Sequence, residues 1–96
     1  MKLVKAVKKP VEISAVWFDG LYETAKDIRS WIGLDIARVE FIGEENQELV
    51  ILISTLKGTM IAHAGDWIIK GVLGGSYPCK PGIFAATYEI IDEENL

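Results

Sequence analysis

The chain has 96 residues, enough for one modest hydrophobic core and too few for two, so we expect a single domain over residues 1–96. Half of the residues are apolar and a quarter are charged, a balance that argues against intrinsic disorder. Fourteen acidic against ten basic residues give a net charge of −4, which makes nucleic acid an unfavourable partner.

The N-terminal third of the sequence predicts a strand followed by a helix. Residues 11–18 alternate along the chain and carry apolar side chains on both faces, which is typical of a strand. Residues 23–32 change to a helical period, with Ala25, Ile28 and Ile32 at steps of three and four. A glycine follows at once and is typical of a helix C-terminus. We expect this to be the only long helix.

The remaining two thirds of the sequence predicts short strands joined by turns. Residues 49–53 are apolar on both faces, which indicates a central strand that is covered on each side. The other expected strands are residues 37–42, 60–64, 67–72, 77–80 and 88–91, with Gly74 and Gly75 in a hairpin turn and one helical turn over residues 81–85.

These elements predict an α+β fold in which one helix packs on a mostly antiparallel, curved sheet, with a half-barrel as one form of that curvature. Residues 49–53 and 67–72 are apolar on both faces, whereas the single helix can cover only part of one face. The remaining apolar surface requires either a curled sheet or a second subunit, so we predict a homo-oligomer.

The sequence contains no arrangement typical of an enzyme, a metal site or a cofactor site. His63 has no serine, cysteine or aspartate at a recognisable motif spacing, and the carboxylates form neither an acid–base pair nor a metal cluster. One cysteine, Cys79, together with one histidine excludes an intrachain disulfide and a Cys/His zinc site. We therefore predict no catalytic residue, no metal and no cofactor.

Two interpretations of Cys79 stay open. Tyr77 and Cys79 share one strand face, and if that is the core face the thiol is packed and neutral. Alternatively, Lys80 or His63 activates the thiol, which would make the protein a cysteine-dependent enzyme. Packing is the favoured interpretation because cysteine is among the most buried residue types.

The C-terminal half carries a motif that resembles a known family. It reads GDWIIKGV from Gly65, then YPCKP from Tyr77, then Ile83-Phe84 and Thr87-Tyr88-Glu89. This resembles the signature of small proteins encoded by tailed phages and prophages, and KKPV from Lys8 matches the usual opening of that family. The family has no established activity, so the resemblance implies a phage context. Ala64 stands where relatives often have proline, and Gly75 and Gly82 stand where they often have acidic residues.

The leading hypothesis is a phage- or prophage-encoded accessory protein that acts without catalysis, by binding a host factor in the cytoplasm of the bacterial cell. No apolar run approaches the ~18 residues of a membrane helix, and no secretion signal precedes the domain. The segment 65–84 combines turns, lysines and aromatic residues, and its expected binding residues are Asp66, Lys70, Tyr77 and Lys80.

Two alternatives remain beside this hypothesis. Lys70 and Lys80 with Tyr77 can instead contact an anionic metabolite or a nucleotide, through charge and aromatic stacking. The segment 65–84 can also be only the folding core. Of the aromatic side chains, Tyr22 and Tyr77 are the two that we expect to be exposed.

Overall fold

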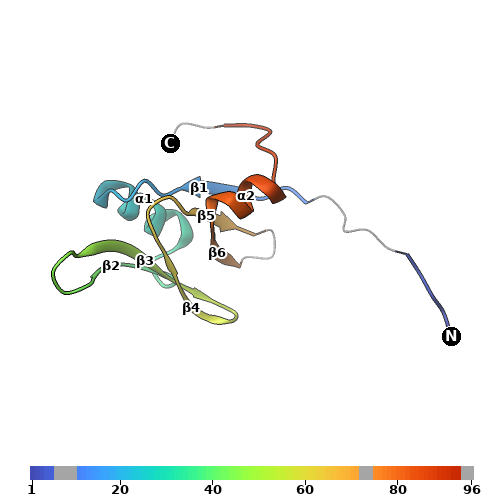
Figure 1. Cartoon of the computed structure of the whole chain (residues 1–96), viewed down its shortest axis with the longest axis horizontal. Coiled ribbons are helices and arrows are strands. Elements are labelled where there is room, and N and C mark those ends of the chain that lie inside the picture. Colours follow the sequence, from blue (N-terminus) through green and yellow to red (C-terminus); the bar gives the residue numbers. More distant parts are fainter. Residues whose placement is uncertain (6–10, 72–74, 94–96) are drawn as a thin grey trace.

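The computed structural model describes residues 1–5, 11–71 and 75–93, and it confirms the α+β class (Figure 1). The strands of the described chain form two antiparallel sheets of three strands each and do not close into a barrel. The elements in chain order are β1 (Ser14–Trp17), α1 (Tyr22–Ile32), β2 (Ala37–Ile42), β3 (Glu48–Thr55), β4 (Gly58–Ala62), β5 (Trp67–Lys70), β6 (Ser76–Cys79) and α2 (Pro81–Thr87).

The first sheet has the order β2-β3-β4, so the expected central position of residues 49–53 is confirmed. Val50, Ile51 and Ile53 have no exposed surface. The second sheet has the order β1-β5-β6, with Trp67 directly between Trp17 on one side and Cys79 on the other. The chain passes from the first sheet to the second in the connection between β4 and β5.

Helix α1 lies over the first sheet and contributes to a core that both sheets share. Ala25, Ile28 and Ile32 are buried at the predicted steps of three and four. Their neighbours in the core come from β3, β4, β5 and the end of β1: Phe18, Ile51, Ile53, Ala62 and Ile68. The helix ends at Gly33, whose N–H donates to the carbonyl of Arg29 and whose φ of 130° is open to glycine.

Helix α2 covers the other face of the second sheet. Pro81 opens the helix, where the missing N–H costs no hydrogen bond. The buried Phe84 stacks on Trp67 with ring centroids 4.2 Å apart and planes 8° from parallel. The helix therefore adds a second layer of apolar contacts on the side of β5 away from the main core.

The chain itself covers both faces of its two most apolar strands. Neighbouring residues on a strand point to opposite faces, and both members of the pairs Val50–Ile51 and Ile68–Ile69 are fully buried. At these strands no uncovered apolar face calls for a second subunit. A homo-oligomer therefore needs a different structural argument from the one that the sequence offered.

Several sequence predictions need correction. Residues 88–91 form no strand; Tyr88 ends α2, its ring packs against Phe84, and Ile90 and Ile91 are exposed. The helical turn expected over residues 81–85 is a helix that continues to Thr87. The first strand is shorter than residues 11–18, and Val72 and Gly74 of the expected strand and hairpin lie outside the described residues. Aromatic contacts and helix packing decide these boundaries, and local periodicity does not report them.

The connection between the two sheets is a tight turn over residues 63–66. The N–H of Asp66 donates to the carbonyl of His63 at 3.0 Å, and Gly65 has a φ of 94°, which defines a type II turn. Phe18 brackets the turn, because its carbonyl accepts from the Gly65 N–H at 2.7 Å and its N–H donates to the Asp66 carbonyl at 2.9 Å. This places Ala64 at the turn position that favours proline.

We predict that Ala64→Pro stabilises the protein by about 0.4–1 kcal/mol, because proline reduces the freedom of the unfolded chain at a position that already suits it. Gly65→Ala is the control and should destabilise, since alanine is strained at a φ of 94°. Urea unfolding of both variants and of the parent checks the prediction. A loss of stability in Ala64→Pro would contradict the type II assignment.

Candidate functional site

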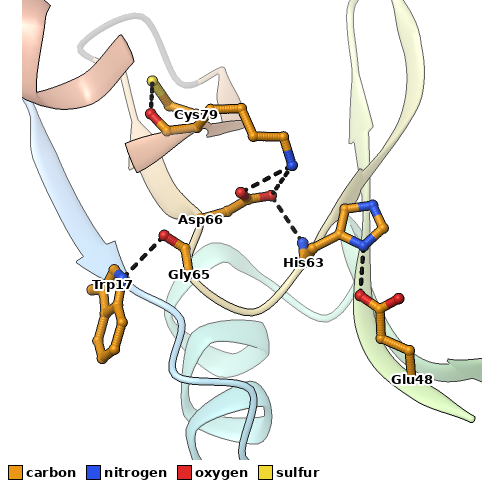
Figure 2. A network of polar contacts seen from close by, with 7 residues as sticks. Trp17, Glu48, His63, Gly65, Asp66 and Cys79 are labelled. Carbon is orange, nitrogen blue, oxygen red and sulfur yellow. Dashed lines mark hydrogen bonds and ion pairs between the residues drawn. The ribbon is translucent and has the colours of Figure 1, made fainter. Parts of the chain in front are cut away.

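The buried carboxylate of Asp66 organises the polar contacts around the turn (Figure 2). Its side chain is 4% exposed, and its Oδ2 accepts from the backbone N–H of His63 at 2.9 Å. The ammonium of Lys80 donates to both carboxylate oxygens, at 3.1 and 3.2 Å. The ion pair joins the start of β5 to the residue that follows β6.

Two further contacts extend this network to the neighbouring strands. The indole Nε1 of Trp17, at the end of β1, donates to the carbonyl of Gly65 at 3.0 Å (Figure 2). The ring of His63 lies with Nδ1 2.6 Å from Oε1 of Glu48, at the start of β3. The turn therefore contacts β1, β3 and the end of β6 through side chains that are far apart in the sequence.

Several aromatic side chains lie along one face of the second sheet and under α2, and we call them the aromatic surface. Trp17 lies directly opposite Trp67 on the same face of the sheet. Trp67 stacks on Phe84, and Phe84 lies 5.2 Å from the ring of Tyr88. The hydroxyl groups of Tyr88 and Tyr77 are 3.3 Å apart. The aromatic surface thus runs from β1 through β5 and α2 to β6.

The aromatic surface is exposed at both ends. Trp17 is 50% exposed and Tyr77 is 37% exposed, while Phe84 in the middle is buried. The hydrogen bond with Tyr88 raises the pKa of Tyr77 to about 12, with further contributions from burial and from repulsion by Tyr88 and Cys79 when they ionise. Tyr77 is therefore a neutral hydroxyl at physiological pH.

The four predicted binding residues do not form one site. Asp66 and Lys80 are brought together, but as an ion pair that orders the turn, in which the carboxylate is buried and the lysine side chain is 60% exposed. Lys70 lies at the other end of β5, with its ammonium 3.3 Å from the carbonyl of Trp31 and 5.5 Å from the centre of its ring. Tyr77 contacts Tyr88. Each of the four side chains is thus engaged in a contact within the chain, and these contacts lie in three different places.

Trp17 and Phe41 are exposed aromatic residues that the sequence did not indicate, at 50% and 59%. Alternation along residues 11–18 places Trp17 on one strand face but does not say whether that face is covered. The exposure expected for Tyr77 and Tyr22 is confirmed, at 37% and 51%.

Cys79 shares a sheet face with Tyr77, as predicted, since their partners Trp67 and Ile69 lie two residues apart on β5. That face lies under α2 and not in the main core, and the thiol is half-buried. Burial raises the pKa of Cys79, and the charge of Asp66 raises it further. Lys80, the cation next in sequence, is paired with Asp66. The thiol therefore stays protonated at neutral pH.

Two open grooves lie away from the aromatic surface. One, of about 410 Å³, is lined by Glu12, Ile13, Ser14, Trp31, Lys70 and Gly71. The other, of about 450 Å³, lies beside β2 and is lined by Arg29, Leu34, Ala37, Arg38, Val39 and Glu40. Lys70 lines the first of these grooves, whereas neither groove contains Tyr77 or Lys80.

Comparisons with protein families, with curated proteins and with solved structures found no match to this chain. Within residues 1–5, 11–71 and 75–93, no group of three or more histidine, cysteine or acidic side chains is arranged to hold a metal ion. Neither of the two helices described is long and apolar enough to cross a membrane.

The ion pair makes a prediction about Lys80. Lys80→Met should cost about 2 kcal/mol, because the methionine still shields part of the Asp66 carboxylate but leaves it without a counter-charge. Lys80→Ala should cost only about 1 kcal/mol, because the smaller side chain lets water reach the carboxylate. Urea unfolding measures both variants. In an Asp66→Asn background the difference between methionine and alanine should vanish, and a difference that persists there would contradict the argument.

Cys79 makes a second prediction. A thiol reagent at pH 7 should modify the native protein more slowly than the urea-unfolded protein, because the raised pKa keeps the native thiolate fraction low. The rate on the native protein should continue to rise with pH beyond the range in which the unfolded thiol has finished titrating. A native rate that equals or exceeds the unfolded rate at pH 7 would reinstate the reactive interpretation.

Proposed function

We propose that this chain is a phage- or prophage-encoded accessory protein that acts by binding a protein of the bacterial host, in the cytoplasm and without catalysis. The contact surface in this proposal is the aromatic surface. The phage context comes from the resemblance in the sequence. The proposal that the protein works by binding comes from the exposure of its oriented aromatic side chains and from the contacts that engage its reactive side chains.

The observation that carries the proposal is the exposed but oriented indole of Trp17. Half of its surface is open to solvent, while its Nε1 is held by the carbonyl of Gly65. An aromatic side chain that is ordered before binding loses little conformational freedom when a partner covers it. Tryptophan and tyrosine are also enriched among the residues that dominate protein interfaces. Trp17 at one end and Tyr77 at the other therefore suit a protein partner.

The reactive side chains support binding rather than catalysis. The Cys79 thiol has a raised pKa, which disfavours the nucleophilic thiolate. The His63 ring contacts the carboxylate of Glu48, and Lys80 contacts that of Asp66. These groups are engaged in contacts that hold the turn and the strands together.

Trp17→Ser tests the proposal, with Tyr22→Ser as the matched control. Tyr22 is equally exposed, at 51%, but lies on α1 away from the aromatic surface. A host protein that the wild-type chain captures from bacterial lysate is purified and its affinity for each variant is measured by calorimetry. We expect Trp17→Ser to weaken binding about 30-fold or more and Tyr22→Ser to leave it unchanged. Equal affinities for the two variants would exclude the aromatic surface.

A second candidate function, sequestration of an anionic aromatic ligand such as a nucleotide, rests on a different observation. The groove beside Lys70 combines an ammonium, the half-buried ring of Trp31 and the hydroxyl of Ser14. Glu12 lines the same groove and opposes an anion there, which is why we rank this candidate second. A thermal-shift screen with nucleotides separates the two functions, because a ligand that binds only the folded state raises the melting temperature.

A further inference from the structure

The outer edge of β2 is an open strand edge. β2 pairs with β3 on one side, and no other strand of the described chain pairs with it (Figure 1). An unpaired edge presents backbone N–H and C=O groups that can bond a further strand. This edge is independent of the aromatic surface, which lies on the other sheet.

The hydrogen-bond pattern identifies which residues face the open edge. The N–H of Ser54 donates to the carbonyl of Ile36 at 2.9 Å, one step before the pair Ala37–Ile53. Bonded and non-bonded pairs alternate along antiparallel strands, so Arg38 and Glu40 direct their backbone groups toward β3. Val39 and Phe41 direct theirs outward, and within residues 1–5, 11–71 and 75–93 no hydrogen bond reaches them.

The side chains along this edge select a second copy of the same edge as the partner. Arg38 and Glu40 flank Val39 and are exposed, with 70% and 44% of their side chains open to solvent. In an antiparallel pair centred on Val39, Val39 meets Val39 of the second copy through two backbone hydrogen bonds. Arg38 then lies opposite Glu40 of the second copy, and Glu40 lies opposite its Arg38. The symmetric pair therefore contains two favourable cross-strand pairs of opposite charge.

The neighbouring registers are unfavourable for the same reason. Outward-facing residues must pair with outward-facing residues, so the register can shift only in steps that move its centre from Val39 to Arg38 or to Glu40. The first places Arg38 opposite Arg38, and the second places Glu40 opposite Glu40. Like charges directly opposite each other are destabilising, so charge selects the register centred on Val39.

The same register accounts for an exposed phenylalanine and for the groove beside β2. Phe41 is 59% exposed, and in this register it lies opposite Ala37 of the second copy. Ala37 lines the groove of about 450 Å³ together with Leu34 and Arg29. Nε of Arg29 is buried and has no hydrogen-bond partner among the described residues. The groove thus offers apolar surface and a cation to the incoming ring.

From these observations we infer that the protein forms a two-fold symmetric dimer in which β2 pairs antiparallel with β2 of a second copy about Val39. The first sheet of one copy and the first sheet of the other then join into one continuous six-stranded sheet with the order β4-β3-β2-β2-β3-β4. A two-fold axis through this edge closes the assembly at two copies, because each copy uses the one edge of β2 that is not paired with β3.

Light scattering of the full chain at about 100 μM tests the dimer, since a pair with a micromolar Kd is almost fully associated there, and sedimentation over a dilution series down to about 1 μM gives the Kd of each variant. The wild type should have twice the 10.6 kDa mass of one chain. Arg38→Glu and Glu40→Arg should each weaken association about tenfold or more, because each places like charges opposite each other. The double variant with both substitutions restores opposite charges in this register and should dimerise again. Lys57→Glu, an exposed charge reversal in the turn between β3 and β4, is the control and should remain dimeric.

Three results would overturn the inference. The first is a wild-type mass different from that of two chains. The second is a dimer that survives either single reversal as well as it survives Lys57→Glu. The third is a double variant that stays as dissociated as the single variants, because this would exclude the register centred on Val39. Trp17→Ser should remain dimeric in the same assay, so the dimer and the proposed host-binding surface fail or succeed separately.

Discussion

The fold depends on one buried carboxylate at the point where the chain crosses between its two sheets. A buried charge is unfavourable unless it is paired and hydrogen-bonded, and Asp66 meets both requirements, with the N–H of His63 and the ammonium of Lys80. One donor comes from the end of the first sheet and the other from beyond β6 in the second. Satisfying Asp66 therefore fixes the turn, the start of β5 and the end of β6 together. The backbone bonds of Phe18 to Gly65 and Asp66 add β1 to the same arrangement.

The aromatic surface follows from that arrangement. The Gly65 carbonyl is free to accept from Trp17 because the turn directs it toward β1. Lys80 is held by Asp66, and Pro81 starts α2 in the next position, so the ion pair lies directly beside the start of α2. Phe84 then reaches Trp67 and completes the row of rings. A buried carboxylate and its partners thus lie beside the aromatic groups at the surface and help to order them.

The two proposed surfaces lie on different sheets and use different physical means. The aromatic surface belongs to β1, β5, β6 and α2, and its affinity would come from the burial of oriented rings. The β2 edge belongs to the first sheet, and its specificity would come from backbone pairing and from the alternation of Arg38 and Glu40. Figure 1 shows β2 and α2 on different sides of the domain. Pairing at β2 therefore leaves the aromatic surface of each copy open.

The sequence by itself determined the elements whose apolar residues recur with the period of a helix or a strand. The period of Ala25, Ile28 and Ile32 specifies α1, the apolar residues around Ile51 specify a central strand, and the alternation of Tyr77 and Cys79 places them on one face. Periodicity reports which residues share a face, but it does not report what covers that face. Only the tertiary structure decided that the strands divide into two sheets, that residues 88–91 form no strand, and that Lys80 forms an ion pair with the buried Asp66. It also decided that Trp17 is half exposed, because the contact that holds it comes from Gly65, 48 residues away along the chain.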